Sequence, residues 1–178
     1  MNIQTKQQLS QSVAGFHLPR YHEIPNVGLY LEQTAKYISE YLDSLGSYPL
    51  TGSMIGNYVK KGLVANPVKK QYDRDQIAYL IFIAVSKIVL PMDDIHMMID
   101  LQKQFYSTEV AYDYFCSELE NVLFYTFGLK DTIDVIGTGE SDQKTMLRNT
   151  IITVAYKIYL DKYCRALRAE MAEAQQEK

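Results

Sequence analysis

The sequence predicts a mainly α-helical protein with at most a short two-stranded wing. Apolar residues recur at helical spacing along most of the chain, and capping residues and glycines mark where helices begin and end. No pattern supports a central parallel sheet. With 178 residues, 47% of them hydrophobic and 22% charged, the chain is long enough to bury a core without disulfide bonds.

The N-terminal part combines a polar segment, an aromatic segment and one helix. Residues 1–15 are polar and rich in glutamine, which predicts a disordered arm. Residues 16–25 mix aromatic side chains with two prolines, which predicts an extended segment that packs through its rings. Apolar residues at helical spacing predict a helix over 26–44, ended by Gly46 and Pro49.

The next segment has the pattern of a short helix, a glycine stop and a compact basic turn. A helix is expected over 52–61, capped by Thr51 at its start and followed by Gly62 just past its end. A turn at 66–67 then leads into a short edge strand over 68–71. This order of elements is typical of a helix-turn-helix with a small wing.

The remaining helices follow from capping signals and apolar spacing. Asp73, with a glutamine three residues later, predicts a capping box and a buried helix to about residue 89. Pro91 is well placed to begin the next helix. Two more helices are expected, over 107–125 and over 142–173.

These elements predict two regions after the arm. Residues 16–104 are expected to form a helix-turn-helix domain, and residues 105–178 a helical region that packs on it or forms a dimer. The last helix carries apolar residues on more of its circumference than one packing face needs. A homodimer is therefore expected as one arrangement, because helix-turn-helix proteins pair two recognition helices on a palindromic site.

Charge is distributed unevenly along the chain. The net charge is −3, but residues 51–90 hold six Lys or Arg against two Asp or Glu. Residues 91–142 hold two Lys or Arg against eleven acids. A basic segment that coincides with the helix and turn is typical of an electrostatic contact with a polyanion, which points to DNA as the partner.

The spacing within 52–61 identifies the side chains that would face DNA. If Ile55 and Tyr58 face the core, short polar groups and lysines lie on the opposite side, where asparagine can read adenine and glycine permits close approach. The expected DNA-binding residues are Ser53, Gly56, Asn57, Lys60, Lys61, Lys69, Lys70 and Arg74. The structural alternative is a solvated polar helix face beside a solvated lysine pair.

Short runs in this region resemble regulators of the MerR type. IGNYVKKGLV at 55–64 is similar to their recognition helix and following turn, whose pattern is roughly I-R-Y-Y-E-x-x-G-L-L. Pro67 with the nearby lysine pair resembles their basic wing. YDRDQI at 72–77 and LPMDDI at 90–95 resemble the starts of their next two helices. The resemblance, over about 50–101, implies a recognition helix in the major groove and a wing on phosphates.

Longer runs resemble an uncharacterised bacterial family, domain of unknown function 1836, which is itself considered MerR-like over this segment. These runs are HLPRYHEIP, LTGSMIGNYVKKGLV and KKQYDRDQIAYLI, and the similarity spans about 16–160. The chain departs from the MerR pattern at Gly56, Asn57 and Val59, where arginine, tyrosine and an acid are usual. No cysteine stands where metal-sensing members bind ions.

No catalytic, metal or cofactor site is expected. The three histidines lack a completing ligand set, and the GTG at 137–139 lacks the third glycine of a dinucleotide-binding loop. The two cysteines are expected as buried thiols of a reducing compartment. The chain is expected to be cytoplasmic without a membrane partner, because it shows no signal-peptide pattern and its longest apolar run, 77–90, is too short to span a bilayer.

Aromatic residues gather in the C-terminal region. They are Phe105, Tyr106, Tyr112, Tyr114, Phe115, Phe124, Tyr125 and Phe127. Such a run is typical of a tyrosine-rich core between helices, which is the interpretation we favour. It is also compatible with a pocket for an apolar small-molecule effector.

The sequence thus favours a DNA-binding transcriptional regulator of MerR-like type that has no enzymatic activity. The alternative is a protein-interaction module that keeps the helix-turn-helix fold without binding DNA, with the acidic segment 91–142 as its docking face. Gly56, standing where the regulators carry arginine, keeps this alternative open.

Overall fold

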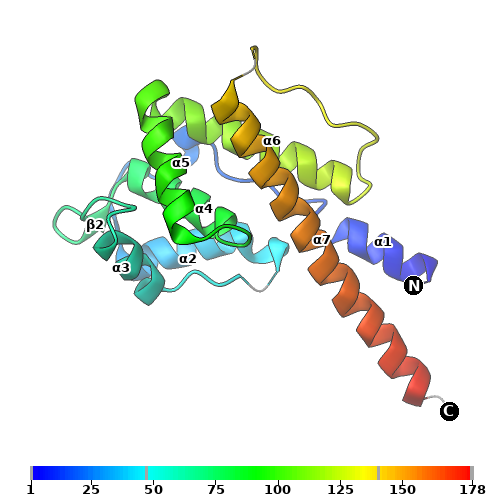
Figure 1. Cartoon of the computed structure of the whole chain (residues 1–178). Coiled ribbons are helices and arrows are strands. Elements are labelled where there is room, and N and C mark those ends of the chain that lie inside the picture. Colours follow the sequence, from blue (N-terminus) through cyan, green and yellow to red (C-terminus); the bar gives the residue numbers. More distant parts are fainter. Residues whose placement is uncertain (1, 47, 140, 177–178) are drawn as a thin grey trace.

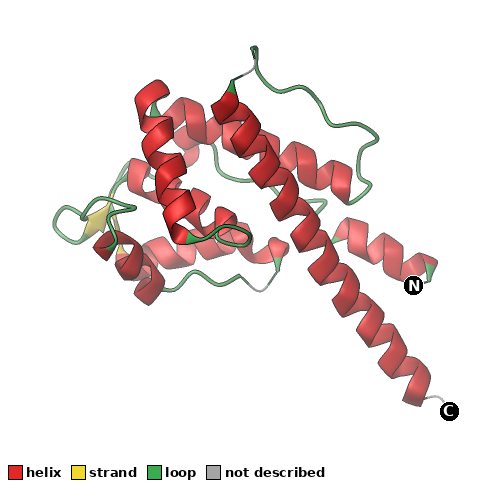
Figure 2. Cartoon of the chain, viewed as in Figure 1, coloured by secondary structure: helices red, strands yellow, loops and turns green. Residues whose placement is uncertain are grey.

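The protein is mainly α-helical, as expected. The structure, a computed structural model, describes residues 2–46, 48–139 and 141–176. In these ranges helices predominate and only two short strands occur (Figures 1 and 2). The α-helices are α1 (Ile3–Gln11), α2 (Leu31–Leu42), α3 (Gly52–Lys60), α4 (Arg74–Ser86), α5 (Met92–Phe105), α6 (Thr108–Thr126) and α7 (Asp142–Gln176). Short 3-10 turns cover Tyr21–Glu23 and Asp43–Leu45.

Helix α4 lies at the centre of the core. It begins with the expected capping box: Asp73 Oδ1 accepts the backbone N–H of Gln76 at 2.9 Å, and Gln76 Oε1 accepts that of Asp73 at 2.8 Å. Helices α2, α6 and α7 pack against it. Its fully buried side chains include Ile77, Leu80, Ile81 and Ile83. The expected buried helix is therefore confirmed.

A two-stranded antiparallel sheet joins the segment before α2 to the segment before α4. Strand β1 (Leu29–Tyr30) pairs with β2 (Gln71–Tyr72), so that Leu29 lies opposite Tyr72. The edge strand expected over 68–71 is wrong, because residues 69–70 form a tight turn and the strand begins only at Gln71. The strands approach closely at Gly28, where a Cβ would lie 2.7 Å from Gln71 Cβ.

Helices α6 and α7 pack against each other and cover α4. The fully buried residues of α7 are Ile151, Val154, Ala155 and Ile158, all in its first half. With 35 residues the helix is roughly 52 Å long. Its C-terminal half extends beyond the body of the molecule (Figure 1).

The N-terminal residues differ from the expected disordered arm. They form α1, whose cap Asn2 accepts the backbone N–H of Thr5 at 2.8 Å. Leu9 and Val13 are buried, and Ser10 donates to the carbonyl of Phe127 at 2.7 Å. The helix contacts α7. Leu9 of α1 and Val13, in the turn that follows the helix, thus anchor an otherwise polar segment on its neighbours.

Residues 16–20 are extended, as expected, but Tyr21–Glu23 form a 3-10 turn. Phe16, Leu18 and Ile24 are buried, so the segment packs through aliphatic side chains as well as through a ring. Arg20 forms a two-pronged ion pair with Glu120 of α6, at 2.7 and 2.6 Å. Glu120 also accepts the backbone N–H of Leu18 at 2.9 Å. These bonds fix the segment on α6, and buried residues of both expected regions belong to one core.

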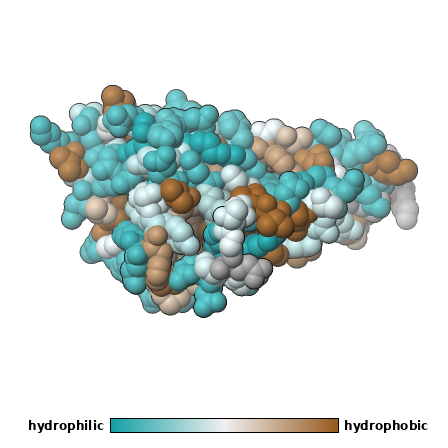
Figure 3. Space-filling model, turned by 90° about the horizontal axis from the view of Figure 1, so that it is seen from above, coloured by the Kyte–Doolittle hydropathy of each residue, from teal (hydrophilic) through white to brown (hydrophobic). Residues whose placement is uncertain are grey.

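None of the helices in the described ranges is both long enough and apolar enough to cross a membrane. Figure 3 shows the molecule from above. On that face hydrophilic residues predominate, and hydrophobic residues gather in separate patches rather than in one continuous band. That face therefore presents no broad apolar surface.

Candidate nucleic-acid interface

Helix α3 has one buried face and one polar, exposed face. Ile55 and Tyr58 are fully buried. On the other side the side chains of Ser53, Asn57 and Lys60 are exposed, and so are Gly56 and, just past the helix, Lys61. All five of these candidate residues therefore lie on the exposed side of the helix, as their spacing predicted. This exposed face carries no acid and no large apolar side chain.

Both ends of α3 are fixed by local bonds. Thr51 Oγ1 accepts the backbone N–H of Met54 at 3.3 Å, as an N-cap does. At the other end Gly62 has φ of +78°, and the N–H of Leu63 donates to the carbonyl of Tyr58 at 3.0 Å. These are the bonds of a Schellman motif, so the expected glycine stop is confirmed.

The two glycines of α3 have different surroundings. A Cβ on Gly52 would lie 2.8 Å from Glu32 Oε1 and 3.3 Å from Leu31 side-chain carbons, so Gly52 lets α3 pack against α2. A Cβ on Gly56 would meet no atom within 4 Å. Packing inside the chain therefore does not require glycine at position 56, although glycine costs a helix about 1 kcal/mol relative to alanine.

The basic turn holds two lysines in an unusual backbone conformation. Lys69 and Lys70 have φ of +50° and +66°, and the N–H of Gln71 donates to the carbonyl of Val68 at 2.9 Å. Two positive φ values between paired residues are typical of a type I′ turn, which favours Asn-Gly. Both lysines are exposed. We call residues 68–71 the basic turn; it lies at the same end of the molecule as α3 (Figure 1).

Arg74 does not share this exposed surface. Its Nε donates to the carbonyl of Ile24 at 2.9 Å, and its guanidinium lies 5.3 Å from the ring centroid of Tyr21. The side chain is half-buried and ties the extended segment 16–25 to the start of α4. We therefore assign Arg74 a structural role and leave it out of the candidate interface.

The remaining candidate cations have no acidic partner among the residues that the structure describes. Within the described ranges, Lys60, Lys61, Lys69 and Lys70 form no ion pair. Helix α5 of the acidic segment approaches the end of α3: a Cβ on Gly62 would lie 4.0 Å from His96 Cε1, and His96 Nε2 is 3.5 Å from Asp100. The four lysines thus remain available to an anionic partner.

The cysteines and the other potential ligands form no metal site in the described part of the chain. Cys116 is buried, as expected, and burial raises the pKa of its thiol to about 12. Cys164 is exposed on α7, so the expectation that both thiols are buried is wrong for this residue. A helix that projects beyond the core leaves one side in solvent.

The interface thus belongs to a mainly helical protein with a short helix and a basic turn exposed at one end. The family model for a domain of unknown function, 1836, matches residues 19–115, more than half of the chain. The protein belongs to this family. The match is shorter than the 16–160 expected from the sequence runs, but it contains β1, β2, α3 and the basic turn. No curated protein and no solved structure matches the chain.

Proposed function

We propose that the protein is a DNA-binding transcriptional regulator with a MerR-like winged helix-turn-helix. Helix α2 is the first helix of the motif, α3 is the recognition helix in the major groove, and the basic turn contacts phosphates. Asn57 and Ser53 supply hydrogen-bonding groups for base edges or phosphates. Lys60, Lys61, Lys69 and Lys70 supply the positive charge.

The observation that carries the proposal is the exposed face of α3 around Gly56. Selection for stability alone favours alanine there, because a Cβ would enter open space. A glycine on an exposed helix face instead lets another backbone approach closely, as the groove walls of a duplex would. The strained lysine pair at the same end of the molecule gives independent support, because strained backbone concentrates at functional sites.

The salt dependence of binding tests this proposal. Fragments of the host genome are selected on the protein, and the best fragment is titrated by fluorescence anisotropy between 50 and 300 mM KCl, a range over which the Debye length falls from roughly 14 Å to roughly 6 Å. Four lysines that each neutralise one phosphate give a slope of log K against log salt of roughly −3.6 per subunit. Absence of any selected fragment would contradict the proposal.

A pair of variants assigns the binding to the interface. The double variant Lys60→Ala/Lys69→Ala should flatten the slope by roughly 1.8 and weaken all fragments alike. Lys6→Ala is the matched control, because Lys6 is an exposed lysine on α1, at the other end of the molecule from α3 (Figure 1). Equal effects of the two changes would place DNA elsewhere.

We further propose a homodimer formed through α7. From its middle to its C-terminal end, α7 carries apolar residues at the spacing of a helix-helix seam, which we call the α7 stripe: Tyr156, Leu160, Leu167 and Met171. Three of these are about half exposed or more: Tyr156 at 49%, Leu160 at 54% and Met171 at 56%. A second copy would bury the stripe and pair two recognition helices. Light scattering after size exclusion should report twice the chain mass.

One observation favours the alternative of a protein-interaction module without DNA. Helix α5 of the acidic segment approaches the C-terminal end of α3 at Gly62, and Asp93 and Asp94 at its start are exposed. An acidic surface beside a basic one suits a protein partner with both signs of charge. Co-purification of one defined partner, free of nucleic acid, would favour this function over DNA binding.

A further inference from the structure

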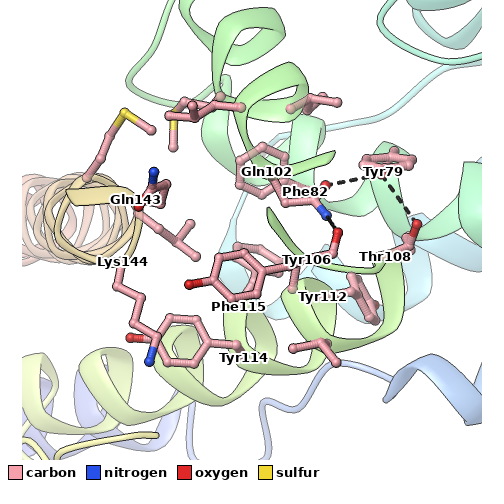
Figure 4. A pocket seen from close by; sticks show the side chains of 18 of the residues that line it. Tyr79, Phe82, Gln102, Tyr106, Thr108, Tyr112, Tyr114, Phe115, Gln143 and Lys144 are labelled. Atoms are coloured by element: carbon pink, nitrogen blue, oxygen red, sulfur yellow. Dashed lines mark hydrogen bonds between the residues drawn. The ribbon is translucent and has the colours of Figure 1, made fainter. Parts of the chain in front are cut away.

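A cavity of about 280 Å³ lies between α4, α5, α6 and the first turns of α7. Its walls are mostly aromatic and aliphatic (Figure 4). They include Tyr79, Phe82, Met98, Tyr106, Phe115 and Leu147. The aromatic residues that we expected mainly as core thus also enclose a space.

The polar groups on the α4–α5 side of the cavity already bond one another. The hydroxyl of Tyr79 donates to Gln102 Oε1 at 3.1 Å and lies 3.3 Å from Thr108 Oγ1. Gln102 Nε2 donates to the carbonyl of Tyr106 at 2.7 Å. Figure 4 shows these bonds on one side of the cavity. This side therefore presents satisfied groups and apolar surface, which suits the apolar body of a ligand.

The opposite side of the cavity holds Lys144, whose ammonium group has one N–H donor left for a ligand. Lys144 Nζ donates to the carbonyls of Thr138 at 2.6 Å and Gly139 at 3.2 Å, and lies 5.5 Å from the ring centroid of Tyr114. An ammonium has three N–H donors, so one remains. Lys144 has no carboxylate partner in the described ranges, and the amide of Gln143 beside it makes no hydrogen bond there.

We propose that this cavity binds a small apolar carboxylate, with its carboxylate on Lys144 and its body among the aromatic walls. Lys144 is the one charged side chain among the described residues that line the cavity. Charge complementarity therefore favours an anion and disfavours an amine. The volume lies near the lower end of the range for ligand sites and suits a molecule of roughly ten to fifteen non-hydrogen atoms.

Three eight-carbon molecules that differ only in the head group test the proposal on the protein alone. Octanoate, octan-1-ol and octylamine are titrated by isothermal calorimetry at pH 7, with 3-phenylpropionate as an aromatic carboxylate. Octanoate or 3-phenylpropionate should bind about tenfold or more tightly than octan-1-ol, because the head group gains a charge-assisted hydrogen bond. Octylamine should show no binding.

Two variants locate the ligand. Lys144→Met keeps an apolar stem of similar length and should lower the carboxylate affinity to that of octan-1-ol. Ala111→Phe places a ring in the cavity from α6 and should abolish binding of both the carboxylates and the alcohol. Lys157→Met is the matched control, because Lys157 lies on the same helix, outside the cavity, beside Asp161.

The titrations have clear results that would overturn the proposal. No binding of either carboxylate at 10 mM, or equal affinity for octanoate and octan-1-ol, overturns the proposal. Retained carboxylate binding in a folded Ala111→Phe variant also overturns it, since the ligand would lie elsewhere. Helix α4 begins just after the basic turn and also lines the cavity, so a bound ligand could alter DNA binding. Such an effect would rest on the function proposed above. Ligand binding measured without DNA stands or fails independently of that function.

Discussion

Replacing Gly56 with alanine should change folding and DNA binding in opposite directions. Gly56 lies within α3 with ordinary helical backbone and open space where a Cβ would stand. Alanine there should raise the free energy of unfolding by about 0.5–1 kcal/mol through helix propensity alone. In a chain of this size that corresponds to a rise in Tm of about 1–4 °C.

The same methyl group should weaken DNA binding. If the duplex approaches Gly56 as closely as packed atoms do, the added carbon must displace it or force a shift that costs about 1–3 kcal/mol. The dissociation constant would then rise by roughly 5-fold to 150-fold. Because no cation is removed, the slope of log K against log salt should stay unchanged.

Gly52→Ala supplies the matched control on the same helix. Its Cβ would lie 2.8 Å from Glu32 Oε1, which can swing away, and 3.3 Å from Leu31, which must yield. The variant should therefore lose most of the propensity gain and be less stable than Gly56→Ala by about 1 kcal/mol. Urea denaturation followed by circular dichroism measures both variants, and anisotropy measures their DNA affinity.

Two results would refute this reasoning. If Gly56→Ala lowers stability, the surroundings of Gly56 are not open and the glycine serves internal packing. If it raises stability and leaves DNA affinity unchanged, no duplex approaches this face, and the proposed recognition helix is wrong. The alternative of a module without DNA binding would then be favoured.

Three further predictions concern the C-terminal helices. Arg148→Met should lower the free energy of unfolding by about 2–3 kcal/mol, because the fully buried Glu118 would lose the guanidinium 3.9 Å away. The double variant Arg148→Met/Glu118→Gln should recover most of that loss, and urea denaturation measures both variants. The pKa of Asp161 is lowered by the hydrogen bonds that it accepts from Lys157 and Tyr48, so Asp161→Asn should lower the free energy of unfolding by less than about 1 kcal/mol at pH 7. Because the contribution of Asp161 is lost as its carboxylate is protonated, thermal melts should show the difference between variant and unmodified protein disappearing as the pH falls below about 4 and through the folded-state pKa. Mild oxidation should cross-link a dimer through Cys164, which is exposed beside the α7 stripe, and Cys164→Ser should abolish the cross-link; a monomeric product would argue against pairing through α7.

The parts of the interface that depend on neighbouring residues could be predicted from the sequence. The capping box of α4, the Gly62 stop and the buried face of α3 all follow from spacings of three or four residues. Bonds of this range form within one helical turn, so a local pattern determines them. The exposed face of α3 follows directly from the burial of Ile55 and Tyr58.

The parts that depend on distant residues could not be predicted. Arg74 bonds a carbonyl fifty positions earlier, and nothing near Arg74 in the sequence signals that partner. Strand β1 has two residues, too few to show alternation. Helix α1 is polar enough to suggest disorder, and its docking on α7 depends on tertiary contacts of Leu9 and Val13. The cavity likewise arises from how four helices meet, which an aromatic-rich sequence does not specify.

If the protein binds DNA as proposed, stability and DNA affinity should place opposite demands on the lysine pair of the basic turn. A lysine in the left-handed region costs about 1–2 kcal/mol relative to an ordinary conformation, and Asn-Gly would fit both positions without strain. Lys69→Asn/Lys70→Gly should therefore stabilise the protein by about 1–3 kcal/mol in urea denaturation. It should also flatten the salt slope of DNA binding by roughly 1.8 per subunit, because two phosphate contacts are lost.

A second double variant separates charge from backbone strain. Lys69→Gln/Lys70→Gln removes the same two charges but keeps two side chains at positive φ. It should flatten the salt slope as much as the Asn-Gly variant and leave the stability nearly unchanged. If both variants keep the slope of the unmodified protein, the turn contacts no phosphate. If only the Asn-Gly variant loses affinity, the shape of the turn, and not its charge, governs binding.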